Sequence, residues 1–254
     1  MKLFDLTGRV AVVTGGNGGI GLGMAQGMAD AGASILVAAR NEEKNTLALS
    51  DLRARGVSAE AIRIDVTDED AGKRIIEAAE LAFGRVDILV NNAGMNIRKL
   101  PEDLILEEWN QVLQTNLTSA FTCSQAVYPA MKLAGGGKII NIGSMFSLFA
   151  APFVIAYASS KGGIVQMTKA LATAWAEDNI QVNAVLPGWI DTELTRRARE
   201  QVDGLYERQL ARMPAGRWGT PDDHAGVAVF LASAASDYIT GISVPVDGGF
   251  SISG

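Results

Sequence analysis

The sequence predicts an α/β fold in which one doubly wound parallel sheet of seven strands carries helices on both faces. Short apolar runs alternate with helix-period patterns along all 254 residues, which is typical of repeated strand–helix–strand units. The runs are apolar at consecutive positions, as strands buried on both faces require. Because 48% of the residues are hydrophobic and no Pro/Ser-rich linker interrupts the alternation, we expect residues 1–254 to form a single domain.

The N-terminal part of the chain contains four expected strands, each followed by a helix or a loop that leads to one. The first strand, residues 9–14, runs into a glycine-rich loop that opens a helix. The expected strands are 9–14, 34–39, a run that ends with 62–66, and 86–90. The expected helices are 22–31, 42–53 and 68–83. This order favours parallel pairing of the strands.

The C-terminal part continues the alternation. A long helix is expected over residues 107–131, on the apolar stripe of Trp109, Val112, Leu113, Leu117, Ala120, Phe121, Val127 and Met131. Strands are expected at 138–142, 181–186 and 242–246, and helices at 157–175 and from about 221. A polar, charged segment, 191–212, follows the sixth strand. The total is seven strands.

The glycine-rich loop after the first strand predicts a dinucleotide site. Two overlapping spacings are present, Gly16-x-Gly18-x-x-Gly21 and Thr14-Gly15-x-x-x-Gly19-x-Gly21. Glycines allow the backbone to approach a pyrophosphate closely, and the helix that follows offers free N–H groups and a favourable dipole. A glycine loop alone could be only a tight turn, but its position between a strand and a helix favours cofactor binding.

The end of the second strand bears on the choice between NAD and NADP. An NAD site commonly has an acid here, which accepts a hydrogen bond from the ribose 2′-OH. This chain has Ala39, and Arg40 follows. An arginine can hold a 2′-phosphate in a forked geometry, so we favour NADP(H), with NAD(H) as the alternative. The other interpretation is that Arg40 is merely solvated.

Residues far apart in the sequence are expected to meet at one edge of the sheet. Gly15, Asp65, Asn92, Ser144 and Pro187 each follow a strand, and the carboxyl ends of parallel strands share one edge. Asp65 could accept from an adenine amino group or belong to the turn that starts the next helix. The sequence therefore predicts a single crevice at this edge.

Tyr157 and Lys161 form the chemically most informative pair in the chain. They are four residues apart, which places both on one face of a helix. A phenol has a pKa of about 10, and a neighbouring ammonium lowers that pKa because it stabilises the phenolate. Such a pair can exchange a proton with a carbonyl or alcohol oxygen, although the spacing alone also occurs on solvated helices.

Composition excludes several other classes of protein. The net charge of −6 argues against nucleic acid or an anionic membrane as partner. The single cysteine, Cys123, cannot form an internal disulfide and fits a reducing compartment, so we expect a cytoplasmic protein. With one histidine, His224, a His/Cys zinc site is not expected, and we assign no metal. The N-terminus lacks the apolar core of a signal peptide.

Taken together, these motifs make the chain resemble the short-chain dehydrogenases/reductases over essentially its full length. Their order and spacing match the family, with no departure at a catalytic position. The matching motifs are Thr14-Gly15-x-x-x-Gly19-Ile20-Gly21, Asp65-Val66, Asn91-Asn92-Ala93-Gly94, Asn116, Ser144, Tyr157-x-x-x-Lys161 and Pro187-Gly188. The resemblance implies a Rossmann-type fold and an NAD(P)(H)-dependent oxidoreductase that transfers a hydride between nicotinamide and a carbonyl or secondary alcohol.

The resemblance also implies roles for individual residues. Tyr157 would be the general acid/base, and Ser144 would hydrogen-bond the reacting oxygen. Lys161 would lower the pKa of Tyr157 and bind the nicotinamide ribose, and Asn116 would hold a water in the proton relay. The implied cofactor-binding residues are Thr14, Gly15, Asn17, Gly18, Gly19, Ile20, Gly21, Arg40, Asp65, Val66, Asn92, Ala93, Gly94, Tyr157, Lys161, Pro187, Gly188, Ile190 and Thr192. The basic residue that some NADP-dependent members carry in the glycine loop is absent.

The substrate is the least constrained feature. A variable substrate loop is expected at about 191–217, and the candidate substrate contacts are Ser144, Met145, Arg98 and Trp189. Arg98 could pair with a carboxylate or could be a surface residue. The nearest resemblance is to sugar-acid members, the 2-deoxy-D-gluconate 3-dehydrogenases and gluconate 5-dehydrogenases.

Three other interpretations stay open at this point. Glucose dehydrogenases and β-ketoacyl carrier-protein reductases share much of the framework. A nucleotide-sensing protein without enzyme activity would be expected to lose Tyr157 or Lys161, and this chain keeps both. Family members are commonly homotetramers, so a homotetramer is expected here.

Overall fold

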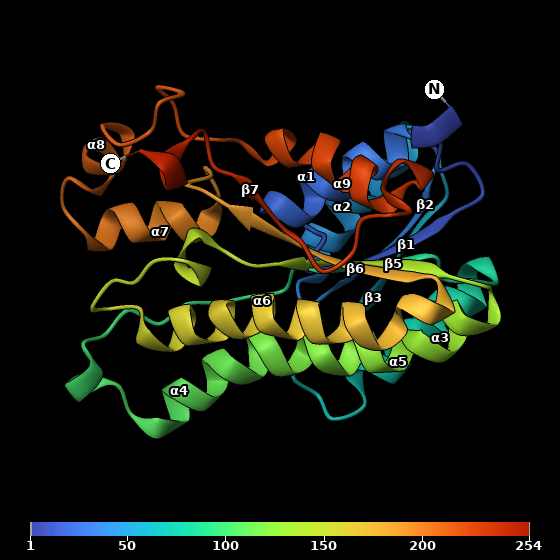
Figure 1. Cartoon of the computed structure of the whole chain (residues 1–254), viewed down its shortest axis with the longest axis horizontal. Helices are drawn as coiled ribbons and strands as arrows, with labels where there is room; N and C mark the ends of the chain where they lie inside the picture. Colours follow the sequence, from blue (N-terminus) through green and yellow to red (C-terminus); the bar gives the residue numbers. More distant parts are fainter. Residues whose placement is uncertain (1, 254) are drawn as a thin grey trace.

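Seven strands form one parallel sheet in the order β3-β2-β1-β4-β5-β6-β7 in the computed structural model, which describes residues 2–253 (Figure 1). The strands are β1 (Val10–Thr14), β2 (Ser34–Ala39), β3 (Ala59–Arg63), β4 (Ile88–Asn91), β5 (Gly137–Ile142), β6 (Ile180–Pro187) and β7 (Ser243–Val246). Every neighbouring pair is parallel. The strand order changes direction between β1 and β4, and a crevice forms where such a reversal occurs. The predicted fold class is confirmed.

Helices cover both faces of the sheet. They are α1 (Gly19–Asp30), α2 (Glu42–Ala54), α3 (Ala71–Phe83), α4 (Leu106–Leu113), α5 (Ser119–Leu133), α6 (Ile155–Trp175), α7 (Glu193–Gln201), α8 (Leu205–Leu210) and α9 (Ala225–Ala232). Figure 1 shows α1 and α9 on one face and α3, α5 and α6 on the other. No helix within residues 2–253 is long and apolar enough to cross a membrane. The charged segment 191–212 contains two short helices, α7 and α8.

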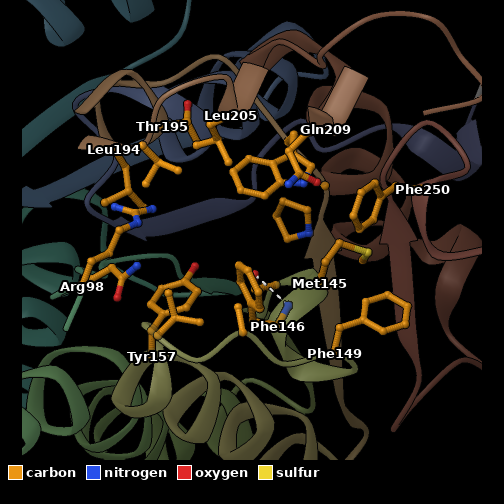
Figure 2. Close-up of a pocket in the computed structure, with 18 of the residues that line it drawn as sticks. Arg98, Met145, Phe146, Phe149, Tyr157, Leu194, Thr195, Leu205, Gln209 and Phe250 are labelled. Carbon is orange, nitrogen blue, oxygen red and sulfur yellow. Dashed lines mark hydrogen bonds between the residues drawn. The ribbon is translucent and has the colours of Figure 1, made fainter. Parts of the chain in front are cut away.

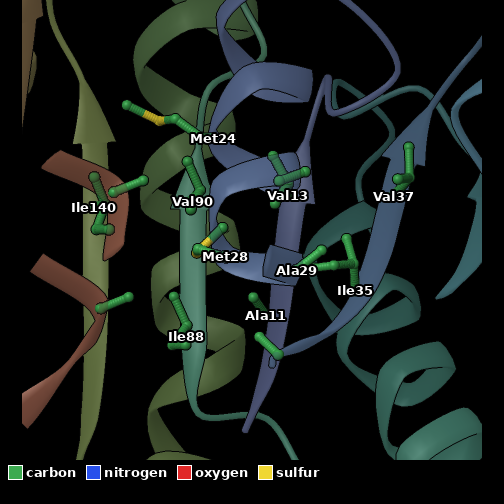
Figure 3. Packing of buried hydrophobic residues seen from close by; sticks show 14 of the residues in the cluster. Ala11, Val13, Met24, Met28, Ala29, Ile35, Val37, Ile88, Val90 and Ile140 are labelled. Atoms are coloured by element: carbon green, nitrogen blue, oxygen red, sulfur yellow. The ribbon is translucent and has the colours of Figure 1, made fainter. Parts of the chain in front are cut away.

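The core under α1 is packed closely because α1 is rich in small residues. Met24 and Met28 of α1 are fully buried against strand residues such as Val13 (Figure 3). The other side of α1 faces α9 and the turn before it. A Cβ on Gly27 would lie 2.6 Å from the Cβ of Ala225, and one on Gly23 only 2.3 Å from the Pro221 carbonyl oxygen. Glycines at these positions let α1 sit against both neighbours.

The third strand and the third helix differ from their predicted limits. β3 ends at Arg63 and does not continue to residue 66, and α3 begins at Ala71 and not at Asp68. The cause is Asp65, whose Oδ1 accepts hydrogen bonds from the Thr67 amide (3.0 Å) and the Thr67 hydroxyl (2.8 Å). A side chain that bonds to the backbone two residues on forms a turn and ends the strand.

The predicted helix over 107–131 is interrupted. Between α4 and α5 the backbone takes a π-helical turn, Gln114–Thr118. A π turn carries one residue more than an α turn, so it rotates the following face of the helix. Asn116 is turned inward and is 2% exposed, whereas Phe121, predicted on the buried stripe, is 43% exposed. The assignment of Phe121 to the apolar stripe was therefore wrong.

Candidate active site

Two cavities meet at the carboxyl edge of the sheet. The first, of about 300 Å³, is the glycine-loop cleft. Its lining residues are Gly15, Asn17, Gly18, Gly19, Ile20, Lys44, Asn92, Ala93, Gly94, Ile142, Gly143, Ser144, Tyr157, Lys161, Pro187, Gly188, Ile190, Thr192, Glu193, Leu194 and Thr195. The second, of about 400 Å³, is the aromatic pocket; Phe146, Phe149, Phe153, Trp189 and Phe250 are among its lining residues. Ser144 and Tyr157 line both cavities, so they lie at the junction.

The glycine loop has the shape that a dinucleotide requires. Gly15 and Gly19 have φ values of +64° and +53°, which side-chain-bearing residues rarely adopt. A Cβ on Gly21 would lie 2.4 Å from Nδ2 of Asn92, and no atom lies within 4 Å of the Cβ position of Gly18. Gly18 is the N-cap of α1 and offers no side chain to its free N–H groups. The open N-terminus of α1 is thus available to a phosphate.

Thr14 and Asn92 hold the loop in place. The Thr14 hydroxyl accepts hydrogen bonds from the backbone amides of Asn92 (3.0 Å) and Ala93 (3.1 Å). The Asn92 side-chain amide donates to the carbonyls of Thr14 (3.0 Å) and Gly15 (3.1 Å). Thr14 is 3% exposed and does not line the cleft. Thr14 therefore holds the backbone of the loop without facing the cleft, whereas Asn92 lines the cleft.

Most of the expected cofactor-binding residues line the glycine-loop cleft, and five do not. Those five are Thr14, Gly21, Arg40, Asp65 and Val66. Arg40 extends to Asp65, with 3.2 Å between Nη1 and Oδ2, and 74% of its side chain is exposed. Val66 is buried in the core below α3. The interpretation of Asp65 as part of a turn is the one that the structure favours, because its Oδ1 is occupied by Thr67.

Lys161 is oriented by a buried backbone carbonyl. Its Nζ donates to the Ile142 carbonyl over 2.7 Å and lies 5.7 Å from the centre of the Tyr157 ring. Burial disfavours the ammonium and lowers the pKa of Lys161 to about 8. Burial also raises the pKa of Tyr157, which Ser144 and the positive charge of Arg98 oppose. The expected lowering of the Tyr157 pKa by Lys161 is therefore not seen: the groups that lower this pKa are Ser144 and Arg98, and desolvation outweighs both.

Asn116 joins three elements through its side-chain amide. Nδ2 donates to the Met95 carbonyl (2.9 Å) and the Ser160 hydroxyl (3.0 Å), and Oδ1 accepts from the Met95 amide (2.8 Å). Both amide hydrogens are thus used within the protein, and a relay water could only approach the remaining oxygen lone pair. Asn116 fixes the segment after Gly94 beside the helix that carries Tyr157.

Ser144 lies at the start of a short turn beside Tyr157. Its hydroxyl accepts from the Phe146 amide over 3.2 Å. Ser147 accepts from the Ser144 amide (3.1 Å) and donates to the Lys161 carbonyl (2.7 Å), so it ties this turn to α6. Ser144, Tyr157 and Lys161 are brought together at the junction of the two cavities, with Asn116 behind Lys161.

The aromatic pocket combines arginine side chains with aromatic and apolar walls (Figure 2). Arg98 lies beside Tyr157 at one end, and Met145, Phe149 and Phe250 lie at the other. The Phe149 and Phe250 rings meet edge to face at 6.3 Å. Trp189 lines the pocket and packs against Trp218 at 5.3 Å. Met145, Trp189 and Arg98, the expected substrate contacts, all line this pocket.

No acidic side chain lines the aromatic pocket, whereas two arginines do. Arg98 donates to Gln201 over 3.4 Å, and no ion pair involves it among residues 2–253. Burial lowers its pKa, and the Tyr157 phenolate would raise it. Arg212 packs its guanidinium 4.4 Å from the centre of the Phe250 ring. In a chain of net charge −6, this pocket is locally positive.

Several lining residues escaped the sequence-based assignment. Lys44 and Glu193 line the glycine-loop cleft, and Gln209 and Arg212 line the aromatic pocket. Only Lys44 carried a signal, since a cation in the first turn of a helix opposes the helix dipole. Within the described part of the chain no group of three His, Cys, Asp or Glu side chains could hold a metal ion.

Comparison with known proteins gives the family. A family model described as enoyl-(acyl carrier protein) reductase matches residues 15–251. Gluconate 5-dehydrogenase of Gluconobacter oxydans (strain 621H) is 40% identical over 254 residues, which cover 99% of this chain and 98% of that protein. The chain belongs to the short-chain dehydrogenase/reductase family.

Two further relatives agree with this assignment. A 2-dehydro-3-deoxy-D-gluconate 5-dehydrogenase of Dickeya dadantii (strain 3937) is 41% identical over 251 residues, 98% of each chain. The crystal structure of a gluconate 5-dehydrogenase from Burkholderia cenocepacia J2315, in complex with NADP and tartrate, has a TM-score of 0.93 and 40% identity and covers 100% of this chain and 99% of that one. The short-chain dehydrogenase/reductase described here is thus an oxidoreductase acting on CH–OH groups with a nicotinamide cofactor.

Proposed function

We propose that this short-chain dehydrogenase/reductase is an NADP(H)-dependent dehydrogenase of a sugar acid. The observation that carries the substrate class is Arg98, which lies beside Tyr157 in a pocket that contains no acidic side chain. Arginine binds a carboxylate in a bidentate geometry, and its partial burial strengthens that interaction. The relatives named above act on gluconate and on 2-dehydro-3-deoxy-D-gluconate by name, which agrees with an acidic substrate.

The proposed catalytic residues are Tyr157, Ser144, Lys161 and Asn116. The bound cofactor would supply or accept the hydride. Tyr157 would give its phenolic proton to the carbonyl oxygen, or take it back, and Ser144 would hydrogen-bond the same oxygen. The positive charge of Arg98 opposes the rise in the pKa of Tyr157. Burial lowers the pKa of Lys161 to about 8, so its ammonium can lose and regain a proton near neutral pH.

Asn116 would act by position. Its amide holds the backbone of Met95 and the hydroxyl of Ser160, and Gly94 lies in contact with it: a Cβ on Gly94 would be 3.3 Å from Oδ1 of Asn116 and 3.6 Å from Nζ of Lys161. The π turn places Asn116 there. We therefore propose that Asn116 keeps the floor of the cleft and Lys161 in register, with its free oxygen lone pair available to a relay water.

The preference for NADP(H) rests on Arg40 and on the absence of an acid at the end of β2. Arg40 is mostly exposed and is held only by Asp65, an exposed pair that contributes little to stability, so it can turn to a 2′-phosphate. The Burkholderia structure contains NADP. Arg40→Ala is expected to weaken NADPH binding about tenfold or more and to leave NADH binding nearly unchanged. Equal losses for both cofactors would refute the preference.

The substrate class is tested by NADPH oxidation, followed by absorbance, with a keto-gluconate and a β-ketoacyl thioester run side by side. A rate with the keto acid alone supports the proposal. A rate with the thioester alone moves the protein to acyl reduction, and silence with both refutes the sugar-acid assignment for the acids tested.

Arg98 can be tested within the same assay. Arg98→Gln is expected to raise KM for the keto acid about tenfold to a hundredfold, because a charged hydrogen bond to the carboxylate is lost. Arg98→Lys keeps the charge and is expected to lie between this variant and the wild type. Arg74→Gln, on the exposed side of α3, is the control and is expected to change nothing. An unchanged KM in Arg98→Gln would remove Arg98 from substrate binding.

Three broader features belong to the same proposal. We propose that residues 1–254 form one domain in which about 191–217 is the substrate loop; α7 and α8 of this segment border the aromatic pocket. We propose a homotetramer, supported by the apolar residues on the edge strand β7, and sedimentation analysis tests it. A cytoplasmic location is supported by Cys123, which is buried and unpaired.

A further inference from the structure

An ion pair joins two residues that line the glycine-loop cleft. Nζ of Lys44, in the first turn of α2, lies 2.5 Å from Oε2 of Glu193, the first residue of α7. Among residues 2–253 this is the one ion pair between α7 and another helix. Both side chains line the cleft, although 149 positions separate them in the sequence. The pair therefore joins one wall of the cleft to the start of the substrate loop.

The two elements that carry this pair both contact the glycine loop. Thr192, which precedes Glu193, packs on the loop so closely that a Cβ on Gly19 would meet its Cγ2 at 3.3 Å. On the other side, Nδ2 of Asn17 donates to Oδ1 of Asn45 over 2.7 Å and fixes the first turn of α2 to the same loop. The two elements that carry the pair are thus both fixed to the loop that leads into the uncapped N-terminus of α1, where a phosphate would bind, and Lys44 lines the same cleft.

Two anions can bind the Lys44 ammonium: the Glu193 carboxylate and a cofactor pyrophosphate. Glu193 does so now, but the pair is half exposed, with 47% and 55% of the side chains accessible, and such pairs contribute little to stability. Glu193 would keep a second partner if Lys44 left, because Nη2 of Arg197 lies 2.5 Å from its other oxygen. A pyrophosphate carries more charge than a carboxylate and would lie next to the open helix terminus.

We propose that Lys44 is a pyrophosphate-binding residue of the nicotinamide cofactor and that Glu193 holds it across the cleft until the cofactor takes the place of the carboxylate. Arg40 has a separate task in this arrangement: it does not line the cleft and is held by Asp65. The proposal depends on the use of a nicotinamide cofactor and not on the identity of the substrate.

The first test is the affinity of Lys44→Met for NADP+ and for NAD+, measured by titration calorimetry without substrate. The expected result is a loss of about tenfold to a hundredfold for both cofactors, since both contain the pyrophosphate. Unchanged affinities would overturn the proposal. A loss for NADP+ alone would also overturn it, because it would place Lys44 at the 2′-phosphate. Since no substrate is present, an error in the sugar-acid assignment cannot imitate either outcome.

Variants of Glu193 distinguish direct binding of the cofactor by Lys44 from simple neutralisation of the Glu193 charge. Glu193→Gln removes the competing carboxylate and is expected to tighten both cofactors a few-fold. In the double variant, Lys44→Met with Glu193→Gln, binding is expected to stay as weak as in Lys44→Met. Recovery of the wild-type affinity in the double variant would mean that Lys44 only neutralises Glu193, and would overturn the proposal.

A matched control is available on α3. Lys73 is an exposed lysine that pairs with Glu77 over 3.6 Å, far from the cleft. Lys73→Met removes the same charge and is expected to leave both affinities and their salt dependence at the wild-type values. The proposal further expects the affinity of the wild type to fall more steeply with added salt than that of Lys44→Met.

Discussion

The glycine-loop cleft and the aromatic pocket share Ser144 and Tyr157 but are built in different ways. The cleft is shaped by backbone: glycines, strand ends and a helix N-terminus leave room for the cofactor. The pocket is shaped by side chains from the segment after β5, from α7 and α8, and from the C-terminal turn that carries Phe250. A cleft shaped by backbone suits a cofactor that a whole family shares, whereas a pocket shaped by side chains can be changed by a few substitutions.

The junction of the two regions should give the largest effect. Tyr157→Phe removes the proton donor and keeps the ring, so we expect kcat to fall by about a thousandfold, within the range typical of a lost general acid. Cofactor affinity should hardly change, because the hydroxyl faces the junction. Turnover near the wild-type value would show that another group transfers the proton.

Lys161 should make stability depend on pH in a defined window. The folded protein holds its proton only below a pKa of about 8, whereas the unfolded chain keeps it up to about 10.5. Unfolding therefore takes up a proton between these values, and the free energy of unfolding should rise with pH there by at most about 3 kcal/mol. Chemical denaturation of the wild type and of Lys161→Met across this range measures the difference. Parallel curves would show that Lys161 titrates normally.

The glycine loop should be intolerant of a side chain at Gly21, which packs behind the cleft on Asn92. Gly21→Ala places a methyl group 2.4 Å from Nδ2 of Asn92, so we expect a loss of about 1–3 kcal/mol in the free energy of unfolding and weaker cofactor binding. Gly226→Ala in α9 is the control, since no atom lies within 4 Å of its Cβ position and the change should be neutral or slightly stabilising. Equal effects of the two changes would contradict a backbone-shaped cleft.

The aromatic pocket should tolerate truncation better. Phe149 is 41% exposed and makes an edge contact with Phe250. Phe149→Ala should change the free energy of unfolding by about 1 kcal/mol or less and alter KM a few-fold. Thermal melting and steady-state kinetics on one preparation give both numbers. A large loss of stability with unchanged KM would make this wall part of the core.

The fold and the location of the site could be predicted because both depend on local patterns. Alternating apolar runs predicted all seven strands, strand ends placed Ser144 at the crevice, helix spacing paired Tyr157 with Lys161, and the family resemblance joined these three residues. The π turn at Asn116 and the early end of β3 were missed, since each depends on hydrogen bonds of single side chains that periodicity does not report. Arg40 was expected in the cleft and instead meets Asp65.

By itself, the sequence determined the sheet, the glycine loop and the spacing of Tyr157 and Lys161, because strand period, helix period and glycine conformation act over a few neighbouring residues. Only the tertiary structure decided which charges face each other. It brought Lys44 to Glu193 at the cleft, Arg98 to Tyr157 in a pocket without acids, and Tyr157 into a site where desolvation outweighs the Ser144 hydrogen bond and the Arg98 charge. These outcomes depend on desolvation and on contacts between distant segments, which no local pattern of residues specifies.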